Sequence, residues 1–187
     1  MDTSLAHPMV LLLRMVFDLV IIFLLLRFFL QAARVDFYNP VTQAIVRATN
    51  PLLAPLRKVI PPLAGQDSAA LVAAVAVAFL FLLLAYTISG GVPHVALLLL
   101  LAPLHLLELA LDMLFWGVII HALLSWFPNA QGAPAARLLD GLITPLLRPI
   151  RRILPELGGI DLSPIALLLV IQMAKILLMP ALLGLVF

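Results

Sequence analysis

The sequence has no cysteine among its 187 residues, and only 11% of the residues are charged. Without cysteine the chain can form neither a disulfide framework nor a thiolate metal site. A soluble domain has about 25% charged and roughly 45–50% apolar residues, whereas here 65% are hydrophobic and the mean hydropathy is +1.22. So few charges cannot cover a water-exposed surface. This composition excludes a soluble enzyme, a disordered chain and a nucleic-acid-binding module, and it indicates a membrane protein.

Sequence motifs that carry catalytic chemistry are also missing. The chain has no glycine-rich phosphate loop, no His-Glu-x-x-His zinc motif and no serine nucleophile elbow. Its four histidines are scattered rather than placed at the spacing of metal ligands. We therefore expect no enzymatic activity, no cofactor, no metal ion and no nucleic-acid partner.

Long apolar runs are abundant instead. A helix needs about 20 predominantly apolar residues to cross the hydrocarbon core of a bilayer, and only helices pair all their backbone groups within one segment. Four stretches qualify, which predicts an all-α integral membrane protein with four transmembrane helices at about residues 8–30, 68–88, 104–126 and 163–187. The third span lies in a longer apolar region that contains Pro103. We expect a kink there, or a short interfacial segment before the span.

Lysine and arginine are concentrated between the first and second spans and between the third and fourth. The positive-inside rule places such loops in the cytoplasm. Both termini are then expected outside, in agreement with an even number of spans. The basic residues of the two loops are Arg34, Arg47, Arg57, Lys58, Arg137, Arg148, Arg151 and Arg152.

The chain contains an internal duplication with an offset of 94 residues. Residues 51–61 (PLLAPLRKVIP) align with residues 145–155 (PLLRPIRRILP), with six of 11 positions identical and four more similar. Each half contributes two spans, so the two repeats enter the membrane in the same orientation, unlike the inverted repeats of many transporters. The same offset aligns Pro40 with Pro134, Gly65 with Gly159, Asp67 with Asp161 and Asp18 with Asp112.

These motifs resemble those of the YggT family, whose plastid relatives are the Ycf19-like proteins. The resemblance rests on Asn39-Pro40, on the two proline-flanked segments and on residues 158–164 (GGIDLSP). It covers essentially the whole chain, with the first repeat expected at residues 1–91 and the second at residues 92–187. It implies a bacterial inner-membrane protein.

The repeated motif predicts a short amphipathic helix on the cytoplasmic surface. Asn50-Pro51 and Thr144-Pro145 have the pattern of an N-cap followed by proline at the first helical position. The basic residues expected to face lipid or a partner are Arg57, Lys58, Arg148, Arg151 and Arg152, opposite an apolar face of Leu146, Leu147, Ile150, Ile153 and Leu154. They could set topology by anchoring to anionic lipid head groups, dock a partner, or bind one head group specifically.

Small polar residues precede the second and fourth spans and are predicted to cap them. Asp67 and Ser68 precede or begin the second span, and Asp161 or Ser163 would cap the fourth, with Pro164 at its first position.

Ionisable residues also lie inside the predicted spans, where a charge is costly and marks a candidate functional group. They are Arg14, Asp18, Glu108, Asp112 and Lys175. At 1.5 Å per residue, Lys175 and Asp112 lie roughly 18 and 21 Å from the same end of their spans. We therefore expect Lys175 to neutralise Asp112 or Asp18 between packed helices. Arg27 is expected to extend to the cytoplasmic interface.

The alternatives to structural pairing of these charges are an ion or proton path and the docking of another protein's helix. The family resemblance implies a non-enzymatic interaction or assembly protein, acting in membrane-complex maturation, cell division or envelope organisation. It also implies an alternative role in potassium balance and osmotic stress, with Asp18, Glu108 and Asp112 as cation-facing groups. The expected partners are the lipid bilayer with its anionic head groups, and a membrane protein or a second copy of the chain.

Overall fold

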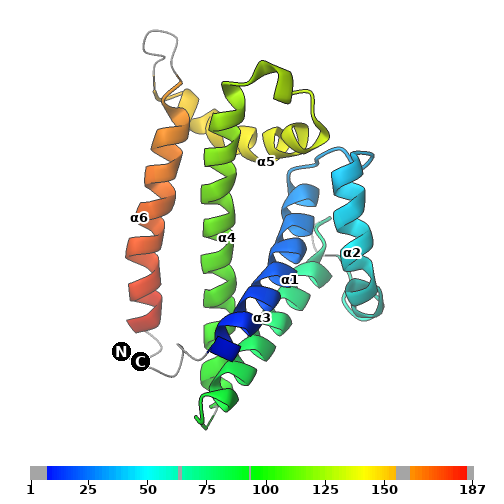
Figure 1. Cartoon of the computed structure of the whole chain (residues 1–187), viewed down its shortest axis with the longest axis vertical. Coiled ribbons are helices and arrows are strands. Elements are labelled where there is room, and N and C mark those ends of the chain that lie inside the picture. The colour runs from blue at the N-terminus through cyan, green and yellow to red at the C-terminus, as the bar shows by residue number, and fades with distance from the viewer. Residues whose placement is uncertain (1–7, 63–64, 93, 155–160, 185–187) are drawn as a thin grey trace.

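The structure, a computed structural model, describes residues 8–62, 65–92, 94–154 and 161–184. Within these residues the chain forms six α-helices and one short 3-10 helix (Figure 1). They are α1 (Pro8–Ala32), α2 (Pro40–Leu56), α3 (Ser68–Ile88), α4 (Val95–Ser125), η2 (Pro128–Ala130), α5 (Pro134–Arg151) and α6 (Ser163–Gly184).

Three of these helices, α1, α3 and α4, are long and apolar enough to cross a membrane. They are consistent with an all-helical membrane protein and overlap the first three predicted spans, although α4 begins nine residues before the predicted start at residue 104. The fourth predicted span coincides with α6, whose apolar stretch, Ser163–Leu178, is shorter than the other three. The last residues of that predicted span, 185–187, lie outside the described residues, as do residues 1–7 before α1.

The interfacial segment predicted before the third span is wrong, because α4 is one helix of 31 residues that continues through Pro103. At 1.5 Å per residue it is roughly 46 Å long. A proline inside a helix removes only one intrahelical hydrogen bond. Leu98 and Ala102, which precede it, are fully buried, and Ala102 packs in the core with α1 and α3. Leu106, which follows the proline, belongs to the same core, so packing stabilises the helix on both sides of the proline.

The amphipathic helices α2 and α5 begin about three turns earlier than predicted, at Pro40 and Pro134 rather than at Pro51 and Pro145. Asn39 is the residue that caps α2, since its side-chain oxygen accepts a hydrogen bond from the backbone N–H of Val41 at 2.9 Å. Two Asn-Pro pairs occur in this segment, and local sequence does not distinguish them. The helix starts at the first pair, because its buried residues begin soon after Pro40 and continue at helical spacing past Asn50-Pro51. These buried residues are Thr42, Ile45, Thr49 and Leu53.

The helices of the two repeats pack side by side. Ile21 and Leu24 of α1 share a buried core with alanines of α3 and with Ala102 of α4. The small alanine side chains let these helices approach closely, as is common between helices in membranes. In Figure 1, α4 stands between α6 and the pair formed by α1 and α3, and α5 runs across the upper end of α4.

The repeats are also joined at the starts of their amphipathic helices. The side-chain amide of Asn39 donates a hydrogen bond to the carbonyl of Pro134 at 2.7 Å. Leu30, Ile45 and Leu138 form one buried cluster across α1, α2 and α5. The ends of both repeats therefore belong to one packed unit, which fixes the positions of the charged residues described next.

Candidate functional site

A buried charge cluster lies where α1, α2 and the start of α3 meet. The Asp67 side chain is 5% exposed, and its carboxylate contacts the guanidinium groups of Arg57 and Arg27, with 3.2 Å between Arg27 Nε and Asp67 Oδ2. Arg27 is 7% exposed, and its Nη1 also donates to the Val46 carbonyl at 3.0 Å and to the Thr49 hydroxyl at 2.6 Å. This cluster ties three helices together through one carboxylate.

Two predictions about this cluster are wrong. Asp67 occupies the N-cap position of α3 but makes no capping hydrogen bond with its side chain, because its carboxylate is engaged by the two arginines. The Ser68 hydroxyl donates to the Pro61 carbonyl instead of capping the helix. Arg27 does not extend to the interface, since it is buried against α2. Sequence offered no signal for this, because the contacts depend on how α2 folds back on α1.

The second repeat has the same ion pair in a more exposed setting. Arg151 and Asp161 are the equivalents of Arg57 and Asp67, and their atoms approach to 2.8 Å. The Asp161 carboxylate also accepts a hydrogen bond from the backbone N–H of Ser163, the first residue of α6, at 2.9 Å. In both repeats, therefore, an arginine at the end of the amphipathic helix binds the aspartate before the next long helix.

The pKa of Asp161 lies below its ordinary value. Partial burial raises this pKa, but hydrogen bonds from Ser163 and Arg151, together with the charge of Arg151, lower it by more. Because the folded pKa is the lower one, the pair stabilises the fold above the ordinary aspartate pKa of about 4, and the contribution is lost as pH falls through the folded value. We expect a carboxyl carbon NMR titration in detergent to give a low midpoint for Asp161, and Arg151→Gln to raise it. An unchanged midpoint in that variant would contradict the assignment.

A second group of charges lies within the long helices. The Asp18 carboxylate on α1 is bound by Arg14 Nε at 3.3 Å and by His105 Nε2 of α4 at 2.8 Å. The His105 ring stacks on Phe81 of α3, with 5.5 Å between the ring centroids. His105 was not predicted as part of this group. The available signal was its spacing from Glu108 and Asp112 at i, i+3 and i+7, which places all three on one face of α4.

About two helical turns further along α4, Lys175 of α6 contacts the Asp112 carboxylate. This confirms the pairing of Lys175 with Asp112 rather than with Asp18. The duplication relates Asp112 to Asp18 and Lys175 to Phe81, so the same carboxylate position is neutralised differently in the two repeats. Among the described residues, the Glu108 side chain has neither a hydrogen bond nor an ion pair.

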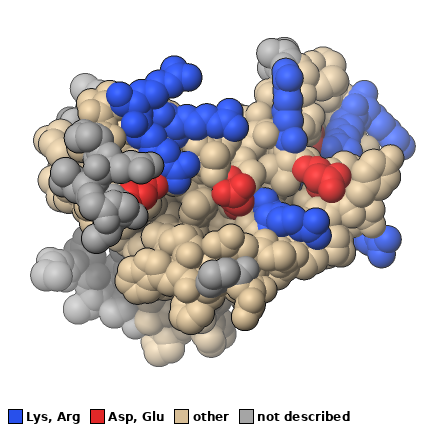
Figure 2. Space-filling view, turned by 90° about the horizontal axis from the view of Figure 1, so that it is seen from above, with Lys and Arg blue, Asp and Glu red and all other residues tan. Residues whose placement is uncertain are grey.

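The basic residues at the ends of α2 and α5 are exposed. Figure 2 shows Lys and Arg side chains gathered on the end of the molecule that is seen from above. Lys58, Arg148 and Arg152 make neither a hydrogen bond nor an ion pair with any described residue. This exposure agrees with the prediction that these basic residues face outward. However, α5 ends at Arg151, so Arg152, Ile153 and Leu154 follow the helix and are not part of its predicted basic and apolar faces.

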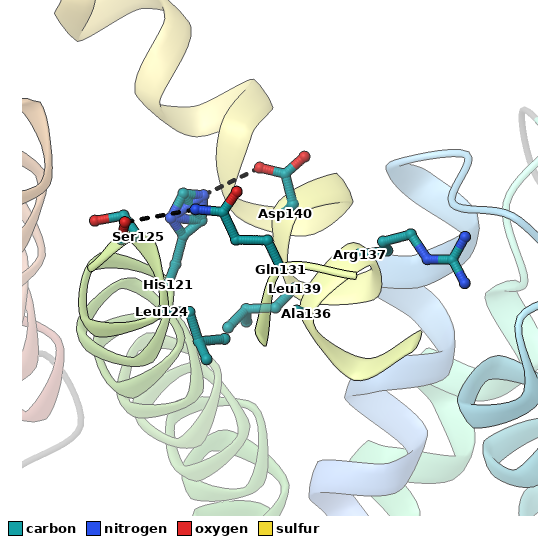
Figure 3. A pocket seen from close by; sticks show the side chains of 8 residues that line it. All are labelled: His121, Leu124, Ser125, Gln131, Ala136, Arg137, Leu139 and Asp140. Carbon is teal, nitrogen blue, oxygen red and sulfur yellow. Dashed lines mark hydrogen bonds and ion pairs between the residues drawn. The ribbon is translucent and has the colours of Figure 1, made fainter. Parts of the chain in front are cut away.

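Each repeat also has a cavity, lined by both polar and apolar side chains, beside these charges. In the second repeat a cavity of about 330 Å³ is lined by His121, Ser125, Arg137 and Asp140 among others. His121 Nε2 lies 3.2 Å from Asp140 Oδ1, as Figure 3 shows. A cavity of about 520 Å³ occupies the equivalent place in the first repeat. The related lining positions are Arg27 and His121, Leu30 and Leu124, Gln31 and Ser125, Phe37 and Gln131, Thr42 and Ala136, and Val46 and Asp140.

The duplicated cavities differ in charge. Three arginines line the first cavity, whereas the second has one arginine and a histidine paired with a carboxylate. Within the described residues, no group of three or more His, Asp and Glu side chains is placed to hold a metal ion.

Comparison with known proteins gives one consistent result. A sequence model of the CCB3/YggT family matches residues 6–88 and again residues 100–182. The two matches are offset as the internal duplication predicted.

Several curated proteins are similar over most of their length. The chain is 40% identical over 164 residues to an uncharacterized protein of Vibrio alginolyticus from the proC 3′ region, covering 87% of this chain and 88% of that protein. It is 39% identical over 163 residues to the uncharacterized protein YggT of Escherichia coli K12, covering 86% and 83%. A relative from Haemophilus influenzae is 38% identical over 148 residues, covering 79% and 78%. No solved structure matches.

Proposed function

The chain belongs to the CCB3/YggT family, and from that premise we propose that it is a non-enzymatic inner-membrane protein that assembles or organises other membrane components. In this proposal α1, α3, α4 and α6 are four spans, and the basic ends of α2 and α5 face the cytoplasm. The excess of arginine and lysine at these ends supports that orientation. Both termini then lie on the outer side.

The observation that carries the proposal is a duplicated exposed turn, which follows α2 at residues 57–59 and follows α5 at residues 152–153. Lys58 is followed by Val59, which is 81% exposed, and Arg152 is followed by Ile153, which is 82% exposed. An exposed basic side chain beside an exposed apolar one is suited to a membrane interface or to the surface of a partner. The same pair occurs at the same place in both repeats, so the chain presents two such contacts.

The role of the two turns is tested by changing charge without changing the packed residues. We expect Lys58→Gln with Arg152→Gln to lower the recovery of a cross-linked partner from native membranes at least about tenfold, since each exposed charge contributes about 1 kcal/mol near an anionic surface. The measurement is quantitative mass spectrometry of the material purified with the full-length protein.

The matched control retains both charges through Lys58→Arg with Arg152→Lys. It should recover the partner at the wild-type level. Recovery that is equal in the neutral and the charged variants, or recovery of nothing but further copies of the chain, would refute an adaptor role.

A second candidate function is ion homeostasis. It is favoured by the charged groups inside the spans, where Asp18 of α1 and His105 and Asp112 of α4 are titratable side chains in contacts between helices. Carboxylates in such positions often line ion or proton paths. This candidate requires potassium flux in liposomes to depend on these side chains.

A further inference from the structure

The cavity of the first repeat is lined by cationic and hydrogen-bonding side chains. It lies between α1, the loop that follows it and α2, and its polar lining residues are Arg27, Gln31, Arg34, Thr42 and Arg57. Gln31 and Arg34 are exposed at its mouth, whereas Arg27 and Thr42 are 7% and 5% exposed. The cavity is therefore a cleft that extends from an exposed rim to a buried floor.

The positive charge of this cavity is only partly neutralised. Among the described residues, Asp67 is the one carboxylate that contacts any of its three arginines, and it binds Arg27 and Arg57. Arg34 has no acidic partner in the described part of the chain. Its backbone has a φ of 54°, in the left-handed region that residues other than glycine rarely adopt. Two positive charges thus remain uncompensated around one cleft.

Hydrogen-bond donors on the floor of the cleft are also unused. Nε and Nη1 of Arg27 are engaged by Asp67, Val46 and Thr49, while its Nη2 makes no hydrogen bond with a described residue. The hydroxyl of Thr42 is buried and has no hydrogen-bond partner among the described residues. A buried polar group without a partner is costly, and a bound water or a ligand that accepts its hydrogen bond would remove that cost.

We propose that this cleft binds a phosphate group, supplied by a phospholipid head group or by a soluble phosphate. Guanidinium groups bind phosphate oxygens in a bidentate manner and with charge assistance. Arg34 at the rim and Arg27 Nη2 with the Thr42 hydroxyl on the floor supply donors from different sides. Phe37, which also lines the cleft and is 59% exposed, suits the boundary between head groups and acyl chains. The proposal goes beyond the docking function and does not rest on it.

The equivalent cavity of the second repeat supplies an internal comparison. Figure 3 shows Asp140 and His121 facing one another there. The duplication replaces Arg27 by His121, Thr42 by Ala136 and Val46 by Asp140. A carboxylate in the lining opposes an anion, and the alanine removes the hydroxyl donor. Phosphate binding is therefore assigned to the first repeat alone.

The test uses purified full-length protein from which lipid has been removed. Binding of phosphatidylglycerol is measured by native mass spectrometry, and binding of inorganic phosphate by phosphorus NMR. We expect Thr42→Val, which keeps the side-chain volume, and Arg34→Gln each to weaken binding on the order of tenfold, the effect of losing one hydrogen bond to a charged group. Arg137→Gln is the matched control, because it removes one arginine from the cavity of the second repeat.

The outcomes separate the two sources of phosphate. Weaker phosphatidylglycerol binding in Thr42→Val and Arg34→Gln, but not in Arg137→Gln, identifies a lipid head group. The same pattern with inorganic phosphate and no lipid binding identifies a soluble ligand. Absence of binding by both probes, or equal binding by all variants, overturns the proposal. Neither substitution touches Lys58 or Arg152, so failure here is distinct from failure of the docking function.

Discussion

Replacement of Asp67 by asparagine is expected to destabilise the fold by about 3–5 kcal/mol, the cost of breaking a buried ion pair by removing one partner. The Asp67 carboxylate is 5% exposed and neutralises Arg27, which is 7% exposed and packed against α2. An asparagine side chain leaves that guanidinium charged, buried and unpaired. Thermal unfolding in detergent should show a midpoint lower by about 10 °C.

The duplication provides the control for this substitution. Asp161→Asn makes the same chemical change at the equivalent position, but the side chains of Arg151 and Asp161 are 43% and 37% exposed. Exposed ion pairs contribute about 0–1 kcal/mol, so the midpoint should fall only slightly. Equal losses in the two variants would mean that burial does not determine the strength of these pairs.

A second variant separates the lost charge pair from a general packing defect. Combining Asp67→Asn with Arg27→Met removes the unpaired buried guanidinium, and it should recover part of the stability that Asp67→Asn alone loses. A double variant less stable than either single variant would contradict the role assigned to Arg27.

The features predictable from the sequence are those set by composition and by distance along a helix. The apolar spans follow from composition, because a run of about 20 apolar residues has few alternatives to a membrane helix. The contact between Lys175 and Asp112 follows from their similar depth, since a charge in a span requires a partner at its own level. Neither inference depends on how the helices are arranged around one another.

The features that sequence could not predict depend on tertiary packing. Arg27 has the local signature of a cation near the end of a span, and its burial is decided by Thr49 and Val46 of α2. Two Asn-Pro pairs are equally good candidates for the start of α2 in the sequence. Only the buried residues of the folded helix show that it begins at the first pair. The spacing of His105 places it on the same face of α4 as Glu108 and Asp112, but no local pattern identifies Asp18, 87 residues away, as its partner.

Replacement of Lys175 by leucine is expected to destabilise the protein by about 2.5–3.5 kcal/mol, because the Asp112 carboxylate then remains unpaired in a span. Asp112→Leu should have a similar cost, since it leaves Lys175 without its partner. The double variant with leucine at both positions should approach wild-type stability, because no charge remains there. The thermal midpoint and the fraction of monodisperse protein in detergent measure all three.

The double variant also separates the structural role of this pair from a role in ion movement. Two well-packed leucines keep the contact between α4 and α6 while removing both titratable groups. If the variant folds and the potassium flux of liposomes that contain it equals that of the wild type, the pair serves only to join α4 and α6. A flux that changes while the thermal midpoint stays the same assigns Asp112 to an ion path. If the double variant is as unstable as Lys175→Leu, the loss of stability in the single variants does not come from an unpaired charge in the span.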